Sequence, residues 1–225
     1  MTSIDAIEII AAVLALMVAI IGHEIMHGYI AYLYGDTTAK EAGRLTINPI
    51  SHIDPVGSIV VPALMYFLPM ILGAGSGFLF GWAKPVPVNV ERVIRNGGYN
   101  AAMQVSLAGI AYNFALAGIV SVVLISLSVP TQADSIWYIA AYIFAVKLLL
   151  INVVLGVFNL LPIPQFDGAH FLMYLSMKLR YPKVAEFFYK AEPYGMIIVL
   201  IILMTPIKDF VLFAPIRFIL QGLLS

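Results

Sequence analysis

Apolar residues gather into five long segments of this chain, at about 4–34, 57–81, 100–129, 135–162 and 194–222. A helix needs roughly 20 consecutive apolar residues to cross a bilayer, and the first, third and fourth segments meet this length. The second contains Pro62, Pro69 and the glycine-rich run 73–77, which interrupt helices. The fifth is broken at 205–209, so it is either one tilted span or a hairpin. The pattern predicts an all-α polytopic membrane protein, a helical bundle forming one domain over residues 1–225.

Composition supports a membrane protein. Of the 225 residues, 62% are hydrophobic and 11% are charged, whereas soluble domains carry roughly 25% charged residues. The formal net charge is zero, so no electrostatic basis exists for binding nucleic acid. The absence of cysteine excludes disulfides, thiolate metal sites and a cysteine nucleophile.

The basic residues indicate how the segments are oriented. Lysine and arginine concentrate in cytoplasmic loops, and here they follow the first, second and fourth segments, whereas the turn at 130–134 has none. If residues 57–81 form a re-entrant segment, all the basic loops lie on the same side. We therefore expect a multi-pass protein of the cell (inner) membrane. The basic residues that follow these three segments are Lys40, Arg44, Lys84, Arg92, Arg95, Lys178, Arg180, Lys183 and Lys190.

Three polar residues interrupt the first apolar segment in the sequence HEIMH, namely His23, Glu24 and His27. An acid at the centre of a bilayer costs about 2.5–3.5 kcal/mol on insertion scales, so these groups need a compensating partner. Histidines at i and i+4 share one face of a helix and can bind one metal ion, and the glutamate of HExxH then serves as a general base. The alternative is a pair of hydrogen-bonded core histidines.

A catalytic zinc site usually has three protein ligands and an open position for water. The candidate third ligand is Asp167, which follows the fourth segment behind Pro162 and Pro164, where Gly168 permits a tight turn. A re-entrant second segment makes the first and fourth segments parallel. Asp167 then lies at the level of the histidines, near the cytoplasmic side.

Several motifs of this chain resemble those of the site-2 proteases, the zinc intramembrane metalloproteases, in their compact prokaryotic branch. The resemblance runs from about residue 15 to 175. It rests on HExxH in the first long segment, AGIAYN at 108–113, NLLPIPQFDG at 159–168, GDTTAKEAGRLTINPISHIDPVGSI at 35–59 and AKPVPVN at 83–89.

The resemblance implies a role for each site residue. His23, His27 and Asp167 would bind one zinc ion per chain, Glu24 would be the base that activates water, and Asn159 would lie near the scissile carbonyl. The expected substrate is a transmembrane segment of another membrane protein. The chain departs from the family pattern at Ile110, Gln165 and His170, which puts fine geometry and substrate choice in question rather than the chemistry.

Other polar residues have more ordinary interpretations. We favour interhelical hydrogen bonding over catalysis for Asn113, and a loop hydrogen bond or Asx turn over a second metal site for His52 and Asp54. His170 is expected beside the metal ligands or at the membrane interface.

Three further segments bear on the surroundings of the site. Residues 43–48 alternate in polarity and predict a short strand, in a possible β-hairpin near the active site. Residues 84–89 are expected to be extended, either along the substrate path or as a rigid loop. Residues 168–192 are expected to form an interfacial amphipathic segment.

Two other functions compete with proteolysis. A metal transporter, or a metal-binding membrane protein without activity, can use two histidines and an aspartate but does not need Glu24. A membrane zinc protease of the CAAX-processing type would take its third ligand from a downstream glutamate, and Glu91, Glu186 and Glu192 lie outside any matching helical motif. The sequence leaves the oligomeric state open.

Overall fold

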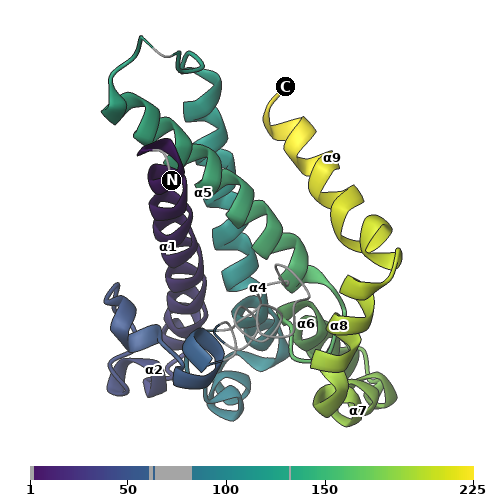
Figure 1. The fold of residues 1–225 in the computed structure, drawn as a ribbon. Helices are drawn as coiled ribbons and strands as arrows, with labels where there is room; N and C mark the ends of the chain where they lie inside the picture. Colours follow the sequence, from purple (N-terminus) through teal and green to yellow (C-terminus); the bar gives the residue numbers. More distant parts are fainter. Residues whose placement is uncertain (1–2, 61–62, 64–82, 132) are drawn as a thin grey trace.

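The computed structural model describes residues 3–60, 63, 83–131 and 133–225, and all its regular elements there are helical (Figure 1). The α-helices are α1 Ser3–Leu33, α2 Thr38–Glu41, α4 Val90–Ile125, α5 Ile136–Leu160, α6 Asp167–Lys178, α7 Pro182–Ala191, α8 Gly195–Met204 and α9 Ala214–Leu223. Short 3₁₀-helices η1 Pro49–His52 and η3 Glu192–Tyr194 and π-helical turns η2 Pro55–Val60 and η4 Asp209–Phe213 connect them.

Helices α1, α4 and α5 pack against one another and form the centre of the bundle. The buried face of α1 carries a small residue at every fourth position, at Ala11, Ala15 and Ala19. Residues four apart lie along one side of a helix, and small side chains there allow close helix contact. His23 and His27 continue this row, so the HExxH motif faces the neighbouring helices.

Helices α1 and α5 run in the same direction, and α4 runs opposite to both (Figure 1). Near the N-terminal end of the bundle, Lys147 Nζ of α5 lies 3.1 Å from Glu8 Oε2 of α1. At the other end, Asp167 follows α5 and reaches the histidines of α1. The parallel arrangement of the first and fourth predicted segments is therefore confirmed.

The predicted re-entrant segment, 57–81, falls mainly on residues 61–62 and 64–82, outside the described residues. The chain on either side of it is described and lies together, because the Lys84 N–H donates to the His52 carbonyl at 3.0 Å. The Arg44 guanidinium donates to the Lys84 carbonyl at 2.6 Å. Both flanks therefore lie at the end of the bundle where α1 finishes.

The predicted strand at 43–48, and with it the β-hairpin, is wrong, since these residues contain a turn and a bend but no strand. Side chains take the backbone groups that a ladder would use: the Thr46 carbonyl bonds His52 Nε2 at 2.9 Å, and Thr46 Oγ1 accepts from the Asn48 N–H. Local bonds of this kind compete with sheet formation. At two positions the expected burial is reversed, because Arg44 is 6% exposed and Ile47 is 85% exposed.

The fifth apolar segment passes along the bundle once. Helix α8 begins against the turn that precedes α6, where a Cβ added to Gly195 would lie 2.3 Å from the Pro164 carbonyl oxygen. After a break at Thr205, η4 and α9 lead back to the end that holds the N-terminus (Figure 1). There Ser121 Oγ of α4 donates to the Leu223 carbonyl. These contacts favour the single interrupted path over the hairpin.

Among the described residues, four helical stretches are long and apolar enough to cross a membrane: Ile4–Leu33, Val90–Ile125, Ile136–Leu160 and Pro182–Met204. The multi-pass character predicted from the sequence is thus confirmed. The last stretch begins earlier than expected because α7 and η3 lead directly into α8. It therefore includes part of the predicted interfacial segment.

The helix directions predict which loops share a side of the membrane. Single cysteines replacing Lys40, Arg95 and Lys183 should react with an impermeant thiol reagent from one face, and a cysteine replacing Ala133 only from the other. The native chain has no cysteine, so the unsubstituted protein is the blank. Reaction of positions 95 and 133 from the same face would contradict this arrangement.

Candidate metal centre

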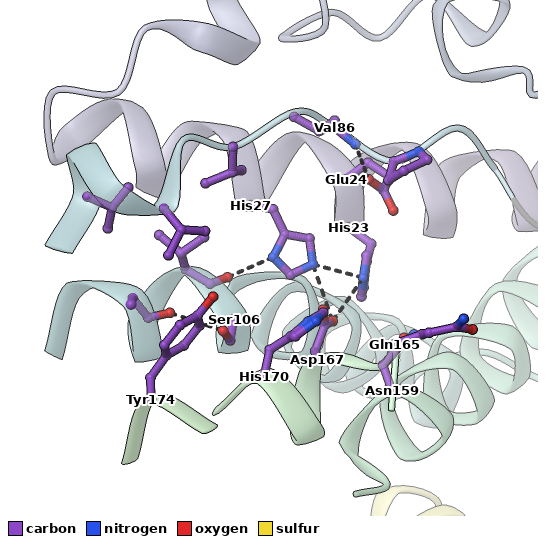
Figure 2. A pocket seen from close by; sticks show the side chains of 16 residues that line it. His23, Glu24, His27, Val86, Ser106, Asn159, Gln165, Asp167, His170 and Tyr174 are labelled. Carbon is purple, nitrogen blue, oxygen red and sulfur yellow. Dashed lines mark hydrogen bonds and ion pairs between the residues drawn. The ribbon is translucent and has the colours of Figure 1, made fainter. Parts of the chain in front are cut away.

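Three potential metal ligands converge where α1, α4 and α6 meet (Figure 2). His23 Nε2 and His27 Nε2 lie 3.0 Å apart, and each lies 3.2 Å from Asp167 Oδ2. In the described part of the chain this is the one group of three or more His, Cys, Asp or Glu residues suited to hold a metal ion. The structure brings together the three residues that the sequence predicts.

Each imidazole makes a hydrogen bond at Nδ1, on the side away from the cluster. This bond determines which ring nitrogen carries the proton. His27 Nδ1 lies 2.7 Å from the Val105 carbonyl, which can only accept, so Nδ1 carries the proton. His23 Nδ1 lies 2.7 Å from Asn113 Oδ1. The Asn113 amide nitrogen donates to the Ala19 carbonyl at 3.3 Å, so its oxygen faces His23 and accepts. Both Nε2 atoms of the neutral rings therefore present lone pairs.

This donor set fits a cation. Two imidazole lone pairs and a carboxylate oxygen face one another without a hydrogen between them, and Asp167 Oδ2 is buried with no hydrogen-bond donor. Buried acceptors left in this state are costly. A metal ion satisfies all three, and two histidine nitrogens with one carboxylate oxygen form a ligand set that zinc uses in hydrolases.

Asp167 reaches the histidines because the chain turns sharply between α5 and α6. A Cβ added to Gly168 would lie 2.2 Å from the Leu160 carbonyl oxygen, so glycine permits the start of α6 to approach the end of α5. The tight turn expected at Gly168 is instead made at Gln165, whose φ of 83° lies in the left-handed region. Asp167 stands in the first turn of α6, where the helix dipole favours a carboxylate.

Glu24 lies beside His23, and its carboxylate accepts from the Val86 N–H at 2.8 Å. Residues 83–89 contain neither helix nor strand, in agreement with the extended segment predicted there. Because Pro85 and Pro87 lack an N–H, Val86 is the only backbone donor between them. The segment thus fixes the orientation of the carboxylate.

A cavity of about 360 Å³ adjoins the cluster. Figure 2 shows the HExxH helix and Val86 on one side and the side chains of α6 on the other. The lining residues are His23, Glu24, His27, Pro85, Val86, Val88, Val90, Val93, Ala102, Val105, Ser106, Asn159, Gln165, Asp167, His170 and Tyr174. The cavity therefore joins the candidate ligands and Glu24 to space for another molecule.

The remaining predicted polar residues divide between the cavity and the loops. Asn159 lines the cavity and donates an amide hydrogen to the Leu155 carbonyl of its own helix at 3.0 Å, so its oxyanion role stays a prediction. His170 also lines the cavity, one turn after Asp167. Asp54 Oδ1 accepts from the backbone of Val56 and Gly57, which confirms the loop interpretation at Asp54.

Gly109, the glycine of the AGIAYN segment, lies against the imidazole ring of His23. A Cβ added there would lie 2.4 Å from Cε1 of the His23 ring. Only a residue without a side chain lets the imidazole lie flush against α4 while Asn113, one turn later, accepts from it. Sequence reasoning missed this contact, as it missed the Val86 donor, whose signal is the lone N–H between two prolines.

Comparison with known proteins decides the family. The chain is 38% identical over 206 residues to "Putative zinc metalloprotease YwhC" of Bacillus subtilis (strain 168), which covers 89% of this chain and 83% of that protein. This chain belongs to peptidase family M50. M50 proteins are zinc metalloproteases of the site-2 protease family, and residues 130–204 match the family directly.

A second M50 relative is more distant. The chain is 31% identical over 191 residues to "Putative zinc metalloprotease Rip2" of Mycolicibacterium smegmatis (strain ATCC 700084 / mc(2)155), covering 82% of this chain and 62% of that protein. No solved structure matches the chain. Membership of M50 excludes the CAAX-type alternative, and Asp167 rather than a glutamate adjoins the histidines.

Two glycines of α4 provide a matched test of the His23 packing. Gly109→Ala should weaken zinc binding and lower thermal stability, because its methyl group overlaps the imidazole and overpacking costs about 1–3 kcal/mol. Gly118→Ala adds the same methyl group to the same helix where nothing lies within 4 Å, and it should cause no loss. Zinc content and thermal unfolding in detergent measure both effects. Equal behaviour of the two variants would contradict the packing role.

Proposed function

We propose that this M50 protein hydrolyses peptide bonds in or near transmembrane segments of other membrane proteins. One observation carries the proposal: three potential metal-ligand atoms, on one buried and two half-buried side chains, converge beside the Glu24 carboxylate inside an apolar helical bundle. His23, His27 and Asp167 hold zinc, and Glu24 is the general base.

Zinc, when bound, supplies Lewis acidity that polarises the scissile carbonyl and lowers the pKa of water. Glu24 accepts a proton as water adds to the carbonyl carbon, and then delivers it to the leaving nitrogen as the C–N bond breaks. The products are a carboxylic acid and an amine. The Val86 N–H holds the Glu24 carboxylate in position for both transfers.

Asn159 has a supporting role in this mechanism. One of its amide hydrogens bonds Leu155, and the other is available to a carbonyl oxygen in the cavity. A donor aimed at a developing oxyanion is worth about 2.7–4 kcal/mol where it has been measured in another hydrolase. We assign Asn159 this role because it lines the cavity that Glu24 also lines.

The position of the site favours a substrate within the membrane. His27 precedes the end of α1 by six residues, about 9 Å along a helix, so the cluster lies inside a stretch long and apolar enough to cross a bilayer. A helical substrate is about 10–12 Å wide and its carbonyls are occupied by its own hydrogen bonds. The substrate must therefore unwind locally before cleavage.

The basic residues favour a site that faces the cytoplasm. Lys40 of α2 and Lys178 of α6 belong to helices at the end of the bundle where α1 finishes and the cluster lies (Figure 1). Arg44 and Lys84 lie beside α2, because the Arg44 N–H bonds the Ala39 carbonyl and its guanidinium bonds the Lys84 carbonyl. Cytoplasmic loops are enriched in lysine and arginine. Residues 126–135, between α4 and α5, carry no basic residue. The protein therefore spans the cell membrane with the 126–135 loop outside.

The metal content provides the first test. Purified protein should contain about one zinc ion per chain, and His23→Ala and Asp167→Ala should each lose most of it because two ligands remain. His52→Ala is the control, since His52 bonds the Thr46 carbonyl and lies outside the cluster. Full zinc content in Asp167→Ala would remove Asp167 from the ligand set.

The second test separates a base from a ligand. Glu24→Gln should reduce cleavage of a membrane-protein substrate by about 10²-fold or more while zinc stays bound. Glu8→Gln is the matched control, because Glu8 lies on the same helix and pairs with Lys147 instead. Comparing the membrane proteomes of cells that carry wild-type protein or Glu24→Gln would identify substrates. Undiminished cleavage by Glu24→Gln would contradict Glu24 as the base, whereas zinc-loaded wild-type protein that cleaves nothing would favour a metal-binding or transport role for the cluster.

A further inference from the structure

Two asparagines lie within the apolar helices that surround His23. Asn113 of α4 and Asn152 of α5 each have 0% exposure. A buried amide without partners costs several kcal/mol, so its hydrogen bonds decide its orientation. Apolar side chains alone could fill these positions, so the two asparagines indicate that a nearby group needs a polar partner.

The two amides form a directed chain that ends at the metal ligand. Asn152 Nδ2 donates to the Leu148 carbonyl at 2.8 Å, and Asn113 Nδ2 donates to Asn152 Oδ1 at 2.9 Å. Asn113 Oδ1 then lies 2.7 Å from His23 Nδ1. Because the Leu148 carbonyl can only accept, every donor and acceptor along the chain is determined.

A second backbone group reinforces this direction. The Ala19 carbonyl also takes a hydrogen from Asn113 Nδ2, at 3.3 Å. Turning the Asn113 amide over would place its NH₂ group toward His23 and its oxygen toward two acceptors. The His23 proton would then move to Nε2, the atom that faces His27 and Asp167.

We propose that Asn113 and Asn152 are positioning residues that hold His23 in the tautomer with the proton on Nδ1, so that Nε2 is always available to zinc. This inference rests on the proposed zinc site. His27 obtains the same tautomer from a backbone carbonyl, which no side-chain substitution removes. His23 instead depends on side chains from two other helices, so the packing of α1, α4 and α5 controls this ligand.

Zinc affinity, measured by competition with a chelator on the purified full chain, tests the proposal without a substrate. Asn113→Leu should bind zinc about 10–100-fold more weakly, the usual effect of losing a partner of a ligating histidine. Asn152→Leu should show a smaller loss, because the Ala19 carbonyl still orients Asn113. Ser121→Ala should bind like wild type, since Ser121 is buried on α4 but donates to the Leu223 carbonyl, away from His23.

Asn113→Asp separates the bond to His23 from helix packing. A carboxylate keeps the acceptor for His23 Nδ1 but loses the donors toward Ala19 and Asn152. Zinc affinity within a few-fold of wild type supports the positioning role. A loss as large as that of Asn113→Leu would show that Asn113 serves helix packing, and would overturn the proposal.

The tautomer itself can be observed, because the chain has four histidines. Two-bond ¹H–¹⁵N correlation spectra of histidine-labelled, metal-free protein, at a pH where the rings are neutral, show which nitrogen carries the proton. His23 should carry it on Nδ1 in the wild type and partly on Nε2 in Asn152→Leu. An Nε2-protonated His23 in the wild type, or an unchanged ratio in Asn152→Leu, would overturn the proposal. Wild-type protein that binds zinc but cleaves nothing would contradict only the proposed proteolysis.

Discussion

The fold holds close together three lone pairs that repel one another. Two imidazole nitrogens and one carboxylate oxygen face one another at 3.0–3.2 Å inside an apolar bundle, an arrangement that is costly until a cation lies between them. Three features of the neighbouring helices bring these atoms together. The small residues of α1 bring the helices close, Gly109 accepts the His23 ring, and Gly168 lets Asp167 approach from the end of α5.

The main features of this arrangement could be predicted from the sequence because they depend on local patterns. The HExxH spacing places two histidines on one helix face, and segment length and charge predict parallel first and fourth helices. Together these were enough to select Asp167 from among the acids of the chain. The geometry of the turn before it was not predictable: the left-handed residue is Gln165, and glycine is needed at 168 for a contact between distant backbone atoms.

The errors arose where tertiary contacts overrode a local pattern. Residues 43–48 alternate like a strand, but Arg44 is drawn inward by the Lys84 carbonyl and Thr46 by His52. No periodicity encodes these bonds. The role of Asn152 is only partly readable from the sequence. An asparagine among apolar residues signals an interhelical hydrogen bond, but only the fold shows that this bond leads through Asn113 to His23. The position of Val86 opposite Glu24 likewise required the chain to be folded.

The distance between the ligands along the sequence has a consequence for biosynthesis. His23 and His27 emerge from the ribosome early, whereas Asp167 follows after well over half of the chain. Until then, His23 and His27 lack the third potential ligand, and before Asn113 and Asn152 have followed, His23 also lacks the asparagines that bond toward its Nδ1. The metal centre cannot assemble before the third long helix is in place. The candidate site therefore stays incomplete during insertion, and it gains its full set of potential ligands only when α5 and the start of α6 are in place.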